Sequence, residues 1–305
     1  MKVGIIGAGS IAGTMAGTIR EMDCAQNYAV AARDYGRAAE FAQTYGFEKA
    51  YGSYEELVED AGVELVYIAT PHSHHYEHIK LCLNHGKHVL CEKSFTVNES
   101  QAREVLALAR EKKLLLTEAI WTRYMPMRKT LDSVLSSGVI GRPYMLTANL
   151  GYIISGKERI MRPELAGGAL LDVGIYPLNF ASMVFGDEVD SITGTAVMTE
   201  TGVDAQNSIT ITYKDGKMAA LCSSAMGLSD RRGIIYGDNG FIEVENINNC
   251  EGIRVYDRSR NMIASYDTPK QISGYEYEVE ACLRAIKEGA LECPEMPHEE
   301  TLRMM

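Results

Sequence analysis

The first twelve residues of the chain, Met1–Ala12, read MKVGIIGAGSIA and decide the fold class. The apolar run Val3–Ile6 is typical of a buried strand, and a helical pattern follows it as far as Arg20. Between them the sequence matches G-x-G-x-x-A, in which glycines allow a tight turn and a close approach of the backbone to a pyrophosphate. The pyrophosphate then lies at the helix N-terminus. The alternative is a tight turn without a ligand. We therefore predict a dinucleotide-binding loop made by Gly7, Gly9, Ser10, Ile11 and Ala12.

Strand-like and helix-like segments alternate from this loop to about residue 120. Strands are expected at 3–6, 28–32, 65–69, 88–91 and 114–117, with helices at 35–45, 55–61, 74–84 and 100–112. Strands at this spacing form a parallel sheet that is covered by helices on both faces. The prediction for residues 1–120 is an α/β domain of the Rossmann type.

The pattern changes after residue 120. A helix is expected at 125–137, alternating strand patterns at 144–152, 208–213, 217–223, 240–246 and 252–257, and a last helix at 275–289. Asp215-Gly216 lies between two of these patterns and is a hairpin signal. Residues 121–305 are predicted to form an α+β domain with an open, mostly antiparallel sheet, used for substrate binding and oligomerisation.

The composition excludes several classes of partner. The 305 residues are 46% hydrophobic and carry a net charge of −11, so nucleic acid and anionic membranes are not expected as partners. The N-terminus starts with a strand pattern rather than a signal peptide, and no stretch approaches the roughly 18 apolar residues of a membrane span. Seven scattered cysteines without a C-x-x-C pair indicate reduced thiols and a cytoplasmic location. The last residues look helical, so a short continuation of the C-terminus is expected.

Two arginines follow the second predicted strand. In NAD-preferring proteins a carboxylate at this strand end binds the ribose 2′-hydroxyl, but here the position is occupied by Ala32. Arg33 follows directly and Arg37 one helical turn later, and two guanidinium groups suit a 2′-phosphate. The alternative is that Arg33 only pairs with Asp34. The sequence favours NADP(H) over NAD(H).

Four histidines lie within residues 72–78, directly after the third long strand pattern. His74 and His78 have the i, i+4 spacing of a metal pair, but no cysteine or carboxylate completes a metal signature. We therefore predict no metal site. Thr70 and Pro71 are expected to line the cofactor, and one histidine is expected to cap the site.

The fourth long strand pattern ends in a charged pair, Glu92-Lys93. The carboxyl ends of parallel strands meet the ligand crevice, so a lysine at this point is expected to reach substrate. The alternative is a surface ion pair, which contributes little to stability.

Several motifs together resemble those of the Gfo/Idh/MocA oxidoreductases, and in particular the branch with dimeric dihydrodiol dehydrogenase and pentose dehydrogenases. The resemblance runs through the whole chain in order, and the motifs that carry it are Gly7-Ala8-Gly9, Thr70-Pro71-His72, residues 86–93 (GKHVLCEK), residues 118–123 (EAIWTR) and residues 167–177 (GGALLDVGIYP). It implies catalysis in a cleft between a Rossmann domain and an open α/β domain. One departure is Ser94, because the family usually has proline after Glu-Lys, and His72 stands where many members have asparagine.

The resemblance also implies roles for single residues. Lys93 would reach the reacting oxygen and Tyr176 would be the proton donor, with Asp172 beside them as the third catalytic residue. His75 falls on the family's active-site histidine and Trp121 on the aromatic wall near the nicotinamide. Contacts to the cofactor are expected from Thr70, Pro71, His72, Glu92, Lys93 and Trp121.

The chemistry of carbonyl reduction fits these residue types. Negative charge develops on the substrate oxygen, which an ammonium group stabilises and a nearby acid protonates. Asp172 lies four residues before Tyr176, so a regular helix would put both on one face. The alternative for this pair is a capped helix with a partly buried tyrosine. Arg123 and Arg159 are further candidates, either for substrate binding or for carboxylate pairs that hold loops.

The leading hypothesis is an NAD(P)-dependent oxidoreductase that acts on a sugar, a polyol or a vicinal diol or ketone. Two alternatives remain at this point: a glycosidase that uses NAD in a redox cycle, and a dinucleotide sensor without catalysis. A homodimer or a higher homo-oligomer is expected, because an uncovered apolar sheet face must be buried.

Overall fold

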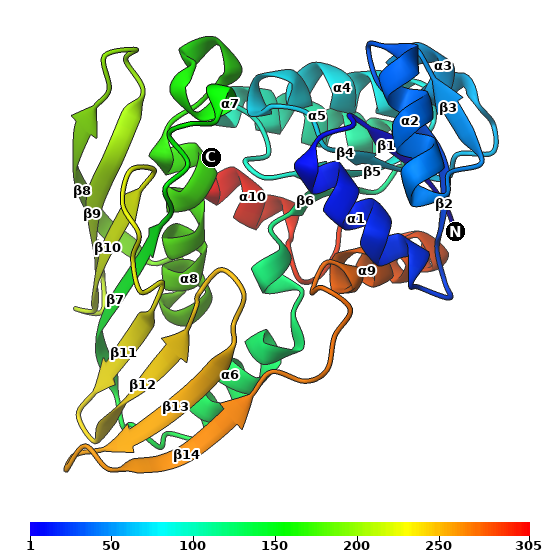
Figure 1. The fold of residues 1–305 in the computed structure, drawn as a ribbon. Helices are drawn as coiled ribbons and strands as arrows, with labels where there is room; N and C mark the ends of the chain where they lie inside the picture. The colour runs from blue at the N-terminus through cyan, green and yellow to red at the C-terminus, as the bar shows by residue number, and fades with distance from the viewer. The chain divides into compact units, whose positions relative to one another are not determined.

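The computed structural model describes residues 1–305, which divide into two compact units (Figure 1). The first unit contains residues 1–124 and 271–305, and the second contains residues 125–270. The predicted α/β fold class is confirmed.

The first unit is built on a parallel sheet of six strands in the order β3-β2-β1-β4-β5-β6. Its strands are β1 (Lys2–Ile6), β2 (Gln26–Ala31), β3 (Lys49–Tyr51), β4 (Leu65–Ile68), β5 (His88–Glu92) and β6 (Leu116–Ala119). Its helices are α1 (Ser10–Arg20), α2 (Tyr35–Tyr45), α3 (Tyr54–Glu59), α4 (His72–Asn84), α5 (Glu99–Lys112), α9 (Glu276–Glu288) and α10 (His298–Met304). The strands β4, β5 and β6 are almost completely buried, as expected for a parallel sheet with both faces covered. The only strand that the sequence did not predict is β3, a three-residue edge strand too short to show a pattern.

The last 35 residues correct the predicted domain division. Residues 271–305 belong to the first unit, where α9 packs on α1 and β5, and α10 packs on α5. The apolar stripe of α9, which includes Val279 and Cys282, is buried there. An amphipathic pattern shows that a helix has a buried face, but it does not show which sheet covers that face.

The second unit contains an eight-stranded sheet in the order β14-β13-β12-β11-β7-β10-β9-β8. Only β10 and β7 pair in parallel, so the prediction of a mostly antiparallel sheet is confirmed. The strands are β7 (Pro143–Gly151), β8 (Val189–Met198), β9 (Asp204–Tyr213), β10 (Met218–Ser224), β11 (Gly233–Gly237), β12 (Gly240–Glu245), β13 (Gly252–Asp257) and β14 (Met262–Asp267). The helices are α6 (Pro126–Ser136), α7 (Glu158–Met161) and α8 (Ile175–Phe185), and α8 packs against β7 and β10.

Three strands of this sheet were not predicted: β8, β11 and β14. The two edge strands, β8 and β14, are largely exposed on both faces, so they lack the alternation of apolar and polar residues that marks a half-buried strand. The hairpin at Asp215-Gly216 is confirmed, because it joins the antiparallel strands β9 and β10.

One helical stretch, residues 163–185, is long and apolar enough to cross a membrane. This corrects the expectation that no segment approaches that length. The share of its most apolar window that is buried inside the structure is 67%, as for a core helix. One such helix is weak evidence for a membrane span.

Candidate functional site

The glycine loop between β1 and α1 has the shape that a pyrophosphate requires. Gly7 has a φ of +104°, and a Cβ there would lie 2.9 Å from the carbonyl oxygen of Ala69, so only glycine fits. A Cβ on Gly9 would meet nothing within 4 Å, which leaves open space at the helix N-terminus. No side chain caps α1 there. The first-turn amides of α1 are therefore open to a phosphate group.

Arg33 and Arg37 lie beside this loop. The Arg37 guanidinium donates to the carbonyl oxygen of Ala8 over 2.8 Å, so it fixes the loop itself. The Asp34 carboxylate caps α2 by accepting the backbone N–H of Arg37 over 2.7 Å. No ion pair joins Arg33 to Asp34, so that alternative is wrong. The Arg33 side chain is exposed next to Ala32, at the strand end where the 2′-phosphate of NADP would bind.

Lys93 follows directly after β5, and the chain beyond it is held from two sides. The Lys93-Ser94 peptide bond is cis, and Ser94 is fully buried. One ring nitrogen of His75 lies 2.9 Å from the Ser94 carbonyl oxygen, and the Phe95 N–H donates to Glu118 over 3.2 Å. These contacts fix the backbone next to Lys93 without the proline that the family usually has.

His75 has a different role from the predicted one. It is fully buried, and its second ring nitrogen lies 2.8 Å from the Thr70 carbonyl oxygen. Burial lowers the pKa of His75 to about 4, so the ring is neutral at physiological pH. The imidazole links the end of β4 to the Lys93 segment, so it positions the backbone instead of contacting substrate.

The other histidines show no metal arrangement. His78 Nδ1 lies 3.0 Å from Thr70 Oγ1, and its ring packs against Tyr54. Burial lowers the pKa of His78 to about 4, and Arg33 is among the neighbouring cations that add to this effect. Nowhere in the chain do three or more His, Cys, Asp or Glu side chains form a group that could hold a metal ion. Arg33 influences the pKa of both His78 and Tyr54, so these two residues lie near Arg33, at the adenosine end of the predicted cofactor site.

Two predicted ligand residues of the first unit have protein partners. Trp121 is 7% exposed, and the ring of Tyr275 stacks on it at a centroid distance of 4.2 Å. Arg123 is buried and forms an ion pair with Glu300 of α10. The structure thus supports the carboxylate-pair alternative for Arg123, whose guanidinium holds the C-terminal segment.

Asp172 and Tyr176 lie in the second unit, on a helix that is not regular. Leu170–Gly174 is a π-helical turn, and α8 begins at Ile175. The expectation of one regular helix is wrong because Pro177 has no N–H to donate to the carbonyl of Val173, and its ring crowds that carbonyl. Such π-helical turns are frequent at functional sites.

The helix start that carries these residues is anchored to the sheet. Asp204 accepts the Leu170 N–H over 2.8 Å and the Asn207 amide over 2.8 Å, and Asn207 accepts from Ser223 over 2.9 Å. Gly168 has a φ of +108°, and a Cβ there would lie 2.2 Å from an Asp204 oxygen. The glycine that the sequence motif contains is thus required by backbone conformation and by the close Asp204 contact.

Arg159 pairs with Asp172 through two contacts, at 2.8 and 3.5 Å. Asp172 is 5% exposed, so Arg159 is its charge partner in a largely dry environment. A paired guanidinium fixes the direction of this carboxylate. Both residues stay in the candidate site, with Arg159 acting through Asp172.

Three residues near Lys93 were not identified from the sequence as part of the site: Tyr67, Glu118 and Glu278. Each is buried, and Tyr67 donates a hydrogen bond to Glu92. Burial raises the pKa of Glu118 to about 7. Their signal in the sequence was weak, although a glutamate within the apolar strand β6 is unusual enough to mark a buried acid.

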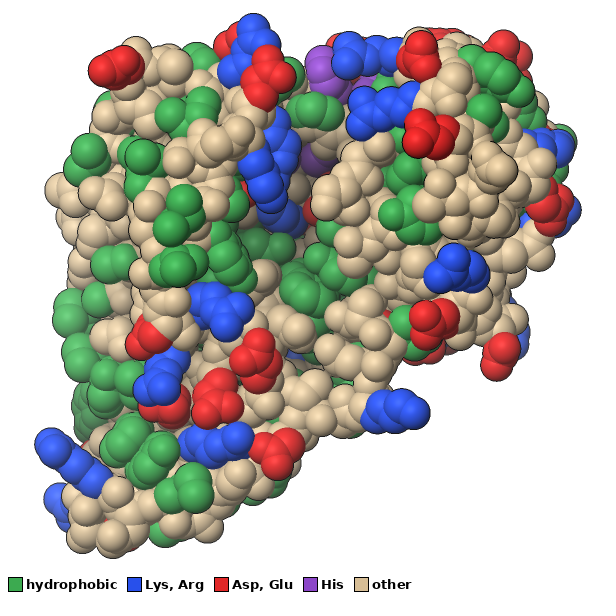
Figure 2. Space-filling view, viewed as in Figure 1, with side chains coloured by type: hydrophobic (Ala, Val, Ile, Leu, Met, Phe, Trp, Pro, Cys, Tyr) green, Lys and Arg blue, Asp and Glu red, His purple; other side chains and the backbone are tan.

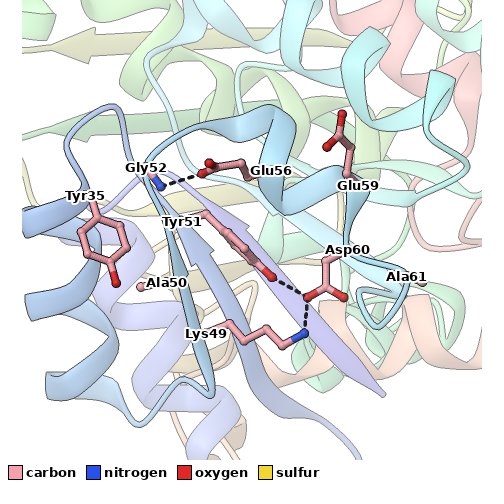
Figure 3. Close-up of a pocket in the computed structure, with 9 residues that line it drawn as sticks. All are labelled: Tyr35, Lys49, Ala50, Tyr51, Gly52, Glu56, Glu59, Asp60 and Ala61. Atoms are coloured by element: carbon pink, nitrogen blue, oxygen red, sulfur yellow. Dashed lines mark hydrogen bonds and ion pairs between the residues drawn. The ribbon is translucent and has the colours of Figure 1, made fainter.

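Two surface hollows lie away from these residues. One, of about 770 Å³, is lined by β3, α3 and their neighbours, and its polar groups bind each other (Figure 3). There Asp60 accepts from Lys49 over 2.7 Å and from Tyr51 over 2.8 Å. The other, of about 450 Å³, lies on the sheet of the second unit around Ser208 and Cys222. Neither contains a residue predicted for the site.

Comparisons with known proteins identify the family of the chain. Residues 1–120 match the model "Oxidoreductase family, NAD-binding Rossmann fold", and residues 129–243 match "GFO/IDH/MocA C-terminal domain". The chain belongs to the Gfo/Idh/MocA family of oxidoreductases, which confirms the resemblance seen in the sequence.

Its curated relatives include trans-1,2-dihydrobenzene-1,2-diol dehydrogenases. The human protein is 36% identical over 99% of this chain and 92% of its own length. The Xenopus tropicalis protein is 34% identical over 97% and 92%. The pig (Sus scrofa) protein is 42% identical over 75% and 70%.

Solved structures show the same architecture over the full chain. A 3-ketoreductase from Actinomadura kijaniata, in complex with NADP and TDP-benzene, has a TM-score of 0.91 at 25% identity and covers 100% of this chain and 94% of its own. An aldose-aldose oxidoreductase from Caulobacter crescentus, at 18% identity and a TM-score of 0.89, shows the fold alone, with the same coverage.

Proposed function

We propose that the protein is an NADP-preferring dehydrogenase that interconverts a vicinal diol, or the related hydroxyl pair of a sugar or polyol, with the matching hydroxyketone. One observation carries this proposal: relatives matched over nearly the whole chain share the name of one diol dehydrogenase activity. The residues fit that activity, since a lysine follows β5, and an aspartate and a tyrosine lie on the α8 segment.

Each residue has a separate task in this reaction. Bound NADP(H) supplies the hydride chemistry. The Lys93 ammonium stabilises negative charge on the reacting oxygen, and the Tyr176 hydroxyl exchanges the proton with it. Asp172, held by Arg159, orients the neighbouring substrate hydroxyl by accepting its hydrogen bond.

A substrate panel tests this function. Purified protein is mixed with NADP⁺ or NAD⁺ and with trans-dihydrodiols, aldoses, polyols and nitrophenyl glycosides, while the absorbance of reduced nicotinamide and the release of nitrophenol are followed. The proposal expects cofactor reduction with a diol or sugar, faster with NADP⁺. Nitrophenol release without net cofactor reduction would instead establish the redox-cycle glycosidase, and cofactor binding without any turnover would establish the sensor.

The cofactor preference is tested with Arg33→Ala. Loss of a hydrogen-bonded guanidinium from a phosphate costs about 1.5–3 kcal/mol, so the Kd for NADP⁺ is expected to rise about 10- to 100-fold. The Kd for NAD⁺ is expected to stay nearly constant, because that ligand has no 2′-phosphate. Arg37→Ala is expected to weaken both cofactors, because Arg37 also fixes the glycine loop at Ala8. Titration of protein fluorescence measures both values, with exposed Arg103→Ala as the control. Equal losses for both cofactors in Arg33→Ala would contradict the NADP preference.

We also propose that two copies associate through the sheet of the second unit. Figure 2 shows hydrophobic side chains along the side where β8, β9 and β10 lie. Val197 of β8 is 56% exposed, and Leu228, in the segment that follows β10, is 76% exposed. Exposed apolar patches of this kind mark interaction surfaces. Light scattering is expected to give twice the mass of the chain, and Val197→Glu with Leu228→Glu to give the monomer mass. A monomer mass for the unchanged protein would refute the dimer.

A further inference from the structure

A buried glutamate of α9 is left without any hydrogen-bond partner. Glu278 is 0% exposed, and neither of its carboxyl oxygens has a partner. An isolated ionised carboxylate in such a place is very costly, so the group takes up a proton instead. Burial, together with Glu92 and then Cys293, raises the pKa of Glu278 well above its ordinary value.

Glu92, the acid that contributes most to this shift after burial, has a hydrogen-bond donor that Glu278 lacks. Tyr67, itself fully buried on β4, donates its hydroxyl to Glu92 Oε1. Two buried carboxyl groups that repel each other do not both ionise, and a donated hydrogen bond favours the charged form. The negative charge therefore belongs on Glu92 and the proton on Glu278. The other titratable groups that influence this set are Tyr124, Tyr275, Cys282, Cys293 and Glu118, the last with Arg123 beside it.

We propose that Glu278 keeps its proton in the folded protein, so that of the three buried groups Tyr67, Glu92 and Glu278 at the Lys93 end of β5 only Glu92 carries a negative charge. Glu92 directly precedes Lys93 in the chain, so this arrangement fixes the charge next to the proposed catalytic lysine. Tyr67 is then a positioning residue, which acts through its hydrogen bond to Glu92. Its link to catalysis rests on the proposed function, but the protonation of Glu278 does not.

Infrared spectroscopy decides the protonation state directly. At about pH 8 an ordinary glutamate is ionised, so a carbonyl band of a protonated carboxylic acid reports a raised pKa. The wild-type protein is expected to show this band, and Glu278→Gln is expected to lose it. Glu118→Gln is the matched control and is expected to keep the band, because the pKa of Glu118 is about 7 and this group is mostly ionised at that pH. Absence of the band in the wild type, or its persistence in Glu278→Gln, overturns the proposal.

Stability gives a second measurement with a definite sign. The folded protein keeps a proton on Glu278 that the unfolded chain releases above a pH of about 4.3. Stability is therefore lost as the pH rises from that value towards the folded pKa, by about tenfold in the unfolding equilibrium per pH unit. Between about pH 7 and about pH 8 Glu118→Gln is expected to keep most of the wild-type slope, because Glu118, with a pKa of about 7, adds only a minor part, and Glu278→Gln is expected to lose the larger part. Equal slopes in all three proteins overturn the proposal. If Glu278→Gln does not fold, the wild-type infrared band is followed from about pH 5 to about pH 9 instead. Complete loss of the band below about pH 8 would also overturn the proposal.

Tyr67→Phe tests the link to Lys93. Without the tyrosine hydroxyl, Glu92 loses the hydrogen bond that favours its charged form, so its pKa rises. The acid limb of the kcat/KM profile is expected to move about one unit to higher pH, equivalent to one charged hydrogen bond. Glu278→Gln is expected to leave the limb in place, because glutamine is neutral like the protonated acid. If Tyr67→Phe lowers kcat/KM equally at every pH and leaves the acid limb at the wild-type pH, the positioning role is refuted. If the protein has no dehydrogenase activity, the proposed function fails and the infrared result still decides the charge state.

Discussion

Replacement of Lys93 by methionine is expected to lower kcat about 10²- to 10³-fold, which is the usual effect of removing one charge-stabilising donor from a developing oxyanion. Methionine keeps the length and the apolar stem of the side chain, so the fold of the segment between β5 and α5 is expected to stay intact. The backbone there is fixed by His75 and Glu118, whose contacts do not use the lysine side chain. Steady-state kinetics with NADP⁺ and the best diol measure the effect.

The control for Lys93→Met is Lys112→Met, which changes an exposed lysine in the last turn of α5. Lys93→Arg adds a further comparison, because it keeps the charge but replaces a compact ammonium by a planar fork, and only partial recovery is expected. Binding of NADP⁺ is measured separately by fluorescence and is expected to persist in Lys93→Met. A Lys93→Met enzyme with nearly normal kcat would show that the charge at the end of β5 has no part in the reaction.

Tyr176→Phe is expected to lower kcat about 10²- to 10⁴-fold, the range for loss of a general acid or base. The KM is expected to change little, because phenylalanine fills the same space at a position that is only 7% exposed. The lost hydroxyl matters in the step that moves the proton, so its removal affects the transition state more than substrate binding. The measurement is kcat and KM over a range of pH values.

Tyr144→Phe serves as the control, because Tyr144 is an exposed tyrosine of the same unit. Its kinetic constants are expected to equal those of the wild type. If Tyr176→Phe instead raised KM and left kcat unchanged, the hydroxyl would be a substrate-binding group, and the proton donor would have to be sought elsewhere.

Much of the first unit could be predicted because its signals are local. Helix α2 was predicted with its observed bounds, Tyr35–Tyr45, since Asp34 caps its start and Gly46, with a φ of +76°, ends it. The glycine loop was equally clear, because Gly7 needs a backbone conformation and a close approach to Ala69 that other residues do not tolerate. The helix cap and the positive φ angles lie within a few residues of the positions concerned, and the contact with Ala69 is visible in the sequence because it requires a glycine.

The roles of several site residues could not be predicted in this way. His75 was expected to contact substrate, but its ring binds the Thr70 and Ser94 carbonyl oxygens inside the protein. For Arg123 the sequence left two roles open, substrate binding or an ion pair with a carboxylate. The structure shows an ion pair with Glu300, which lies far along the chain. A polar residue in a motif shows that a polar contact is needed, but the partner depends on how distant segments pack.

The fold class, the dinucleotide loop, the arginine pair after β2 and the position of Lys93 at a strand end follow from the amino-acid order alone. Hydrophobic periodicity and glycine geometry encode these features locally. The packing of α9 on the first unit, and the burial of its Glu278 beside Glu92 and Tyr67, became visible in three dimensions. The physical reason is that burial and charge repulsion depend on which segments meet in space, and here they bring together side chains that are about 200 residues apart in the chain.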